Sequence, residues 1–178
     1  MQFFKYYLEN ILKYDFINRF NYNNISYIPS LEKVILCFEY KNPTYKQILN
    51  SLLALELITK SKADLLTLKK SNVSLKLRAG SPIGCKVTLK KLKMLDFIST
   101  LFLILIPQDK NFVINFSTKN YTKSLSFDFK SLFLFKELKD HYSVLKDLSN
   151  LSIVLITDSK NISEFVFFMK SLKVKFFM

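Results

Sequence analysis

The chain has 178 residues, of which 49% are hydrophobic, so it can bury the core of one domain and is not a wholly disordered protein. Lysine and arginine outnumber aspartate and glutamate by 27 to 14, and the net charge of +13 points to a polyanionic partner, most often RNA or DNA and sometimes an anionic membrane surface. The two cysteines, Cys37 and Cys85, form neither a disulfide framework nor a spacing typical of zinc sites, so we expect buried thiols.

The sequence contains no evident targeting or membrane-spanning segment. The stretch MQFFKYYLENILKYDF lacks the charged region, apolar core and small-residue cleavage site of a secretory signal. Glu9 and Asp15, with no arginine before Arg19, argue against a cleaved mitochondrial transit peptide. The longest apolar run, 97–106, is too short to cross a bilayer. We therefore do not expect an integral membrane protein, and we expect that a protein of this sequence working in an organelle is made there.

The first third of the chain predicts a helix, a strand and a second helix. Apolar residues at helical spacing predict an amphipathic helix over about residues 3–20. In LEKVILCFEY, residues 31–40, apolar and polar positions alternate as a half-buried strand requires. Asn42 and Pro43 are expected to supply the N-cap and the first-turn proline of a helix that ends at about Lys60.

The next segment, 63–90, predicts a long hairpin or ribbon, because two β-like stretches flank the polar KKSN. Its tip is basic. A period of two assigns alternate residues of each stretch to opposite faces of a strand. In GCKVTLK the polar face carries Lys86, Thr88 and Lys90, and the apolar face carries Cys85, Val87 and Leu89. In SLKLRAG the polar face carries Lys76 and Arg78.

The remaining elements are less regular. A helix is predicted over about 91–106 and is followed at once by Pro107. The stretches NFVINF and YTKSLSFDF predict another hairpin, whereas region 130–148 is ambiguous. LSIVLIT predicts a strand, and Asp158 or Ser159 is expected to cap a last helix. The sum is α+β, with helices packed on one face of a mostly antiparallel sheet, in a single domain 1–178.

The sequence offers little for catalysis. Its one histidine, His141, lies in the charged stretch KELKDHYSVLKD, where a solvated side chain is expected. The acidic residues are scattered among lysines, and no HExxH, GxSxG or phosphate-binding lysine loop is present. We therefore predict that the protein is not an enzyme and that it needs no cofactor, metal or small-molecule substrate.

RNA binding has better support, because charge and strand geometry agree. If the two strands around residues 76–78 and 86–90 belong to one sheet in matching register, they present a cationic surface over an apolar underside. Arg78 could then contact two phosphate oxygens, and Thr88 a phosphate or a 2′-hydroxyl. The alternative, a solvent-exposed face with lysines for solubility, fits the pattern equally well. Tyr22 is either a polar contact or an ordinary turn tyrosine, and most phenylalanines are expected in the core.

The stretch KLRAGSPIGCKVTLK, residues 76–90, resembles the signature of a family of universal large-subunit ribosomal proteins, the L-five family, which binds 5S ribosomal RNA. The family pattern is Lys, apolar, Arg, any, Gly, any, then Pro-Ile-Gly-Cys-Lys-Val-Thr-Leu. Upstream, FNYNNISYIPSLEKVIL is similar to the family's Phe-Asn-Tyr-Asn segment, spaced proline and Glu-Lys. The resemblance covers about residues 5–175 and is strongest up to about 107.

The resemblance implies a structural protein in the central protuberance of the large subunit, where it holds 5S rRNA against the large rRNA. Implied partners are 5S rRNA where it is present, large-subunit rRNA, P-site tRNA, and neighbouring proteins of the protuberance and of the small-subunit head. The implied rRNA-binding residues are Tyr22, Asn23, Asn24, Lys33, Lys76, Arg78, Lys86, Thr88 and Lys90. The loop implied to approach P-site tRNA comprises Lys69, Lys70, Ser71, Asn72, Val73 and Ser74. Gly80, Pro82 and Gly84 are expected to shape the backbone between the RNA-facing segments.

The chain also departs from the family pattern. Cys37 replaces an asparagine that meets 5S rRNA, QDKNFV replaces an Arg-Asp-Phe-Arg-Gly segment, and a glycine-rich loop is reduced to Asn120 and Tyr121. These losses indicate a divergent organellar version, which we expect in the mitochondrial matrix on the mitochondrial ribosome and encoded in the organelle genome. Two alternatives stay open, namely a free RNA-binding module or chaperone of the same fold and a peripheral membrane protein.

Overall fold

The computed structural model describes residues 2–41, 43–71, 73, 77–108, 114–115, 124–172 and 176–177. The chain divides into two compact units, and each is described by itself. Unit 1 comprises Met1–Val34, Lys90–Leu125 and Leu155–Met178. Unit 2 comprises Ile35–Leu89 and Ser126–Val154.

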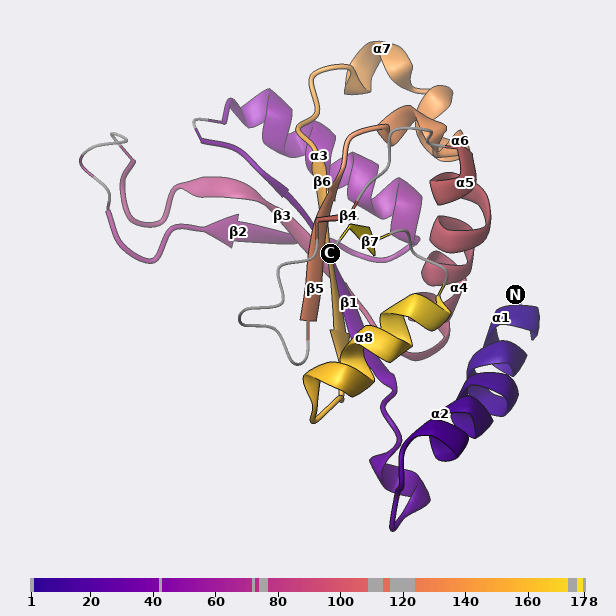
Figure 1. Cartoon of the computed structure of the whole chain (residues 1–178). Coiled ribbons are helices and arrows are strands. Elements are labelled where there is room, and N and C mark those ends of the chain that lie inside the picture. The colour runs from indigo at the N-terminus through magenta and orange to yellow at the C-terminus, as the bar shows by residue number, and fades with distance from the viewer. Residues whose placement is uncertain are drawn as a thin grey trace. The chain divides into compact units, whose positions relative to one another are not determined.

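The chain forms both helices and strands (Figure 1). The helical elements are α1 (Gln2–Tyr6), η1 (Tyr7–Leu12), α2 (Lys13–Arg19), η2 (Ile25–Tyr27), α3 (Tyr45–Thr59), α4 (Lys91–Thr100), η3 (Leu101–Leu105), α5 (Ile106–Gln108), η4 (Leu132–Leu134), α6 (Lys136–Lys139), α7 (Tyr142–Leu145) and α8 (Ile162–Ser171). The strands are β1 (Leu31–Glu39), β2 (Asp64–Thr67), β3 (Pro82–Leu89), β4 (Ile114–Asn115), β5 (Ser124–Phe129), β6 (Leu151–Thr157) and β7 (Phe176–Phe177).

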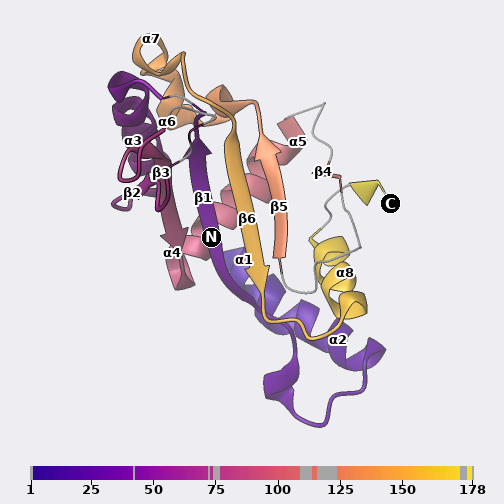
Figure 2. The ribbon, with the colours of Figure 1, turned by 90° about the vertical axis from the view of Figure 1, so that its left-hand side faces the viewer.

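Five strands form one antiparallel sheet in the order β2-β3-β1-β6-β5. Figure 2 shows β6 between β1 and β5 and running against both of them. At the other edge β2 pairs with β3, with Asp64 opposite Lys86, and a bulge interrupts the pairing between Leu66 and Thr67. The predicted α+β class on an antiparallel sheet is therefore confirmed.

In unit 1 the predicted N-terminal helix is confirmed. It runs without a break from Gln2 through α1, η1 and α2 to Arg19, and its middle turn is π-helical. Phe16 is fully buried, and its ring meets that of Phe167 edge-on with the centroids 4.9 Å apart. The hydroxyl of Tyr7 donates to the Ser171 carbonyl oxygen at 2.8 Å. Aromatic packing and a hydrogen bond therefore hold this helix against α8.

The second long helix of unit 1 is formed by α4, η3 and α5, from Lys91 to Gln108. The apolar stripe that the spacing predicts is buried at Met94, Ile98, Leu101, Phe102 and Leu105. Pro107 lies in the last turn, where a missing backbone N–H disturbs little of the helix beyond it. The described part of the helix therefore continues past Ile106, its predicted end, to Gln108.

In unit 2, α3 packs on the apolar face of β3. Ser51 of α3 donates from its hydroxyl to the Cys85 sulfur at 3.4 Å, and the Cys85 thiol lies 3.6 Å from the Ile48 carbonyl oxygen. Leu55 is fully buried in the same layer. Both cysteines of the chain are buried free thiols, as predicted. This packing leaves the other face of β3 turned away from α3.

Two helix starts were predicted wrongly. The N-cap of α3 is Thr44, not Asn42, because Thr44 and Gln47 form a capping box: the Thr44 hydroxyl accepts from the Gln47 N–H and the Gln47 side chain accepts from the Thr44 N–H. The N-cap of α8 is Asn161 rather than Asp158 or Ser159, since Asn161 forms the same device with Glu164. In both cases a residue three positions downstream decided the start.

One strand pairing was also predicted wrongly. The partner of β4 is β7, in parallel, and β5 lies beside β6 in the large sheet, so NFVINF and YTKSLSFDF do not pair in the described part of the chain. The hairpin predicted over 63–90 is confirmed, because β2 pairs with β3 in antiparallel register. The chain turns at 77–81, where the Gly80 N–H donates to the Leu68 carbonyl oxygen. The predicted strand LSIVLIT is confirmed as β6, and the ambiguous region forms η4, α6 and α7.

Candidate nucleic-acid interface

The face of β3 that is turned away from α3, its outer face, carries polar side chains, as the alternation of polar and apolar residues predicted. Thr88 is exposed and Lys86 is half-buried, while Cys85, Val87 and Leu89 are buried on the α3 side. A half-buried lysine lays its methylene chain on the sheet and keeps its ammonium group in solvent. The face can therefore offer a charge and a hydroxyl to a phosphate backbone.

Arg78 lies in the turn between β2 and β3 and is exposed. Its carbonyl oxygen accepts from the Ser81 N–H at 3.2 Å and from the Ser81 hydroxyl at 2.7 Å, which fixes the backbone of the turn. In the part of the chain that the structure describes, no carboxylate pairs with its guanidinium. Arg78 is therefore available for a bidentate contact with an outside anion.

Gly80 and Gly84 are required to be glycines for two different physical reasons. Gly80 has φ +85° with open space around it, so it is required by backbone conformation. A side chain at Gly84 would overlap the Phe38 carbonyl oxygen of β1 and lie 3.2 Å from the Phe38 carbonyl carbon. At Gly84 the close neighbour that requires a glycine is therefore the adjacent strand of the sheet.

Unit 1 holds the other residues expected to bind rRNA. Tyr22, Asn23 and Asn24 lie in the loop between α2 and η2, with both asparagines exposed. Burial and then the nearby Glu164 carboxylate raise the pKa of Tyr22 to about 12. Lys33 pairs with its neighbour Glu32 at 3.4 Å, which offsets part of its attraction for an outside anion.

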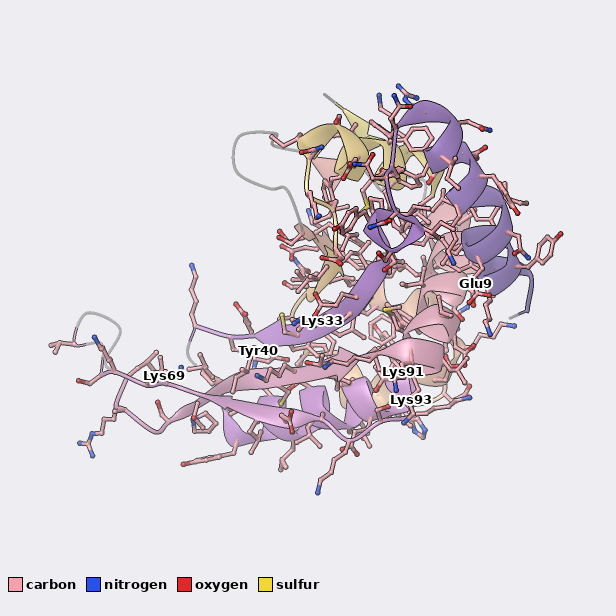
Figure 3. The ribbon with its side chains drawn as sticks, turned by 90° about the horizontal axis from the view of Figure 1, so that it is seen from below. Glu9, Lys33, Tyr40, Lys69, Lys91 and Lys93 are labelled. Atoms are coloured by element: carbon pink, nitrogen blue, oxygen red, sulfur yellow. The ribbon has the colours of Figure 1, made fainter. Side chains whose placement is uncertain are left out.

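The expected site residues divide between the units. Unit 2 contains Lys69, Lys70, Ser71, Val73, Arg78, Lys86 and Thr88, and Figure 3 shows Lys69 beyond the end of β2. Unit 1 contains Tyr22, Asn23, Asn24, Lys33 and Lys90. Lys76, Asn72 and Ser74, like Asn120 and Tyr121, lie outside the described residues. Each unit thus has its own exposed cationic and hydrogen-bonding groups.

Comparison with known proteins shows to which family this chain belongs. Residues 82–176 match the model of the C-terminus of the ribosomal L5 family. The large ribosomal subunit protein uL5m of Reclinomonas americana is 35% identical over 163 residues, which are 90% of this chain and 90% of the relative. The chain belongs to the uL5 family. The uL5 of Malacoplasma penetrans is 33% identical over 90% of this chain and 86% of its own, and that of Borreliella afzelii 30% over 98% and 93%.

Membership of the uL5 family gives the chain a structural role in the ribosome and makes it a non-enzymatic protein. The predicted recognition of a divergent organellar member is confirmed. Among the described residues, no cluster of three or more histidines, cysteines or acids could hold a metal ion. No helix in the described ranges combines the length and apolarity needed to cross a membrane.

Acidic groups surround Cys37 of β1 in the sheet of unit 2. The Cys37 thiol lies 3.7 Å from the Ser152 carbonyl oxygen, and burial, followed by Glu39, raises its pKa to about 11. Asp128 accepts from the Ser152 hydroxyl at 2.6 Å. Two carboxylates therefore lie around a neutral thiol, and they would repel phosphate at this part of the sheet in unit 2.

The sequence did not predict a second group of lysines in this uL5 chain. In unit 1 a cavity of about 220 Å³ with a mostly apolar lining has three exposed lysines around it: Lys5, Lys13 and Lys91. Figure 3 shows Lys91 and Lys93 at the start of α4, directly after Lys90. The sequence signal that could have predicted part of this group is the spacing of Lys5, Glu9 and Lys13, which follow one another at intervals of four residues on one helix.

Proposed function

We propose that this chain is a structural constituent of the large subunit of a mitochondrial ribosome. It binds large-subunit rRNA and, where the organelle retains it, 5S rRNA in the central protuberance. The observation that carries this proposal is the 35% identity with a uL5m over 90% of both chains. The net charge of +13 supports it, because a highly basic small protein requires a polyanionic partner.

The RNA contact of unit 2 runs from the 77–81 turn along the outer face of β3. Arg78 forks onto two phosphate oxygens, Lys86 contributes a mobile charge and Thr88 a hydroxyl. Such contacts hold an RNA backbone by charge and shape rather than by reading bases. The acidic surroundings of Cys37 keep the backbone off the neighbouring part of the sheet.

The exposed residues Lys69, Lys70, Ser71 and Val73, continuing through Asn72 and Ser74, form the segment that approaches P-site tRNA. Its two lysines would meet the tRNA backbone by charge alone. The further partners that we propose are neighbouring proteins of the protuberance and of the small-subunit head. The protein acts in the mitochondrial matrix, and its gene lies in the organelle genome.

The proposal is tested by reversing the charge of Arg78 and Lys86 together, as Arg78→Glu/Lys86→Glu. We expect this variant to be lost from sedimented large subunits, because two attractive phosphate contacts become repulsive. The matched control is Lys46→Glu/Lys146→Glu, which changes the net charge equally at two exposed lysines of the same unit. Lys46 lies on α3, which covers the opposite, apolar face of β3. The measurement is immunodetection of both variants across a sucrose gradient of organellar ribosomes.

Normal assembly of the Arg78 and Lys86 variant would show that this face does not bind rRNA. Loss of the control variant as well would mean that total charge, rather than the β3 face, decides assembly. Wild-type protein that co-sediments with RNA away from ribosomes would support the free RNA-binding module instead.

A further inference from the structure

A small polar cavity lies in unit 1 between the loop 21–27 and the start of α8. Its volume is about 230 Å³, and its lining includes Tyr22, Asn23, Tyr27, Lys160, Asn161 and Glu164. Ligand sites for drug-sized molecules usually measure about 300–1,000 Å³. This cavity can therefore take one small group, not an extended ligand.

A buried carboxylate forms one wall of the cavity. Glu164 is 6% exposed, and its carboxylate accepts from the N–H groups of Lys160 and Asn161 at 3.3 and 3.4 Å and from the Asn161 side-chain amide at 3.4 Å. No lysine or arginine in the described part of the chain neutralises it. A carboxylate oxygen has room for more than one donor, so Glu164 can accept a further hydrogen bond from a ligand.

The hydroxyl of Tyr22 is the second notable group. Its oxygen is buried and makes no hydrogen bond of good geometry within the described residues, while burial and the nearby Glu164 carboxylate raise the pKa of Tyr22 to about 12. An unsatisfied buried hydroxyl is unfavourable, because it has lost its hydrogen bonds to water. In a folded protein such a group calls for an explanation, and a ligand that completes its hydrogen bonds is one.

The remaining groups of the cavity combine a cation with an aromatic ring. Tyr27 is 47% exposed, and the Lys160 ammonium nitrogen lies 3.9 Å from the centroid of its ring. The Asn23 side chain adds an exposed amide that can both donate and accept. A partly exposed aromatic ring with a lysine over one face offers both an aromatic surface and a charge, which proteins combine to hold an unstacked base and its phosphate.

We propose that this cavity binds one unpaired RNA base that carries an exocyclic amino group. The amino group donates to Glu164, a ring nitrogen or carbonyl accepts from Tyr22, and the attached phosphate meets Lys160. Uracil is disfavoured, because the only donor on its pairing edge, N3–H, lies between two carbonyl oxygens that would face the same carboxylate. This inference rests on the proposed function, and it adds base selection to a contact otherwise made by charge.

The test uses Tyr22→Phe, which removes only the hydroxyl, and eight-nucleotide RNAs of adenine, cytosine or uracil. We expect the wild-type protein to bind the adenine and cytosine RNAs more tightly than the uracil RNA, and Tyr22→Phe to lose about 2- to 10-fold of the affinity for the first two, the value of one hydrogen bond. Fluorescence anisotropy with labelled RNA measures both. The control, Tyr14→Phe, makes the same change at an exposed tyrosine of α2 and should leave all affinities unchanged.

A series of salt concentrations separates this inference from the proposed function. The slope of affinity against salt reports phosphate contacts, so Tyr22→Phe should leave it unchanged. Equal wild-type affinities for the three RNAs, or a Tyr22→Phe variant indistinguishable from wild type, would overturn the base site while salt-dependent RNA binding persists. Absence of RNA binding at low salt would overturn both proposals. The melting temperature of Tyr22→Phe is measured in parallel, so that a loss of affinity caused by unfolding is recognised.

Discussion

At the scale of single residues, glycine is the most informative residue type in this chain, because the composition supplies only two. Gly80 is required by a positive φ that L side chains rarely adopt, and Gly84 by the backbone of the adjacent strand. The sequence predicted that both positions constrain the backbone. It could not predict which of them faces a neighbour, since Phe38 lies in a strand far away along the chain.

Gly84→Ala should destabilise the protein by about 3 kcal/mol, at the upper end of the range for overpacking, because the added methyl meets backbone atoms that cannot rotate away. Gly80→Ala should cost about 1–2 kcal/mol, the strain of a left-handed residue with no clash. Urea unfolding followed by circular dichroism measures both. Equal decreases in the free energy of unfolding at the two positions would show that the close approach of Phe38 does not destabilise the Gly84→Ala variant.

At the scale of elements, the hydrophobic pattern determines where helices and strands lie, but not how they begin or pair. The burial of alternate residues in β3 and β6 follows the period of two, and that of the first helix follows the helical spacing. The two helix caps and the strand pairing that were predicted wrongly each had a competitor: another side chain could cap the helix, or another strand could pair with the same strand. Thr44 displaced Asn42 because its partner Gln47 completes a reciprocal pair of hydrogen bonds.

Thr44→Ala should lower the free energy of unfolding by about 1 kcal/mol, because the Gln47 N–H loses its acceptor at the start of α3. Thr44→Ser keeps the hydroxyl and serves as the matched control, with a loss of only a few tenths of that value. Thermal unfolding of the two variants and of the wild type in parallel measures the difference. A serine variant as unstable as the alanine variant would contradict the capping role.

At the scale of the whole molecule, the chain passes between the two compact units inside β1, β5 and β6 and between Leu89 and Lys90. A strand that belongs to both units cannot unfold in one and keep its full ladder in the other. We therefore propose that residues 1–178 unfold as one domain, as the absence of linkers in the sequence predicts.

One cooperative thermal transition is expected. Far-ultraviolet circular dichroism reports the backbone, and near-ultraviolet circular dichroism reports the tyrosines and phenylalanines, which are the aromatic residues of a chain without tryptophan. The two signals should give the same midpoint, and the calorimetric enthalpy should equal the van't Hoff enthalpy. Two separated transitions would mean that the units are independent domains.

The sequence by itself determined the class of the protein. Net charge, the lack of catalytic motifs and the Arg-x-Gly-x-Pro-Ile-Gly-Cys-Lys signature can be read without knowing the fold. The family comparison confirms the class that they predict. Only the tertiary structure decided which strands are neighbours, why Gly84 is a glycine, and that Tyr22, Tyr27 and Glu164 surround one cavity. These facts join residues that lie far apart along the chain. Periodicity describes a residue's own element, whereas a site depends on distances that only packing fixes.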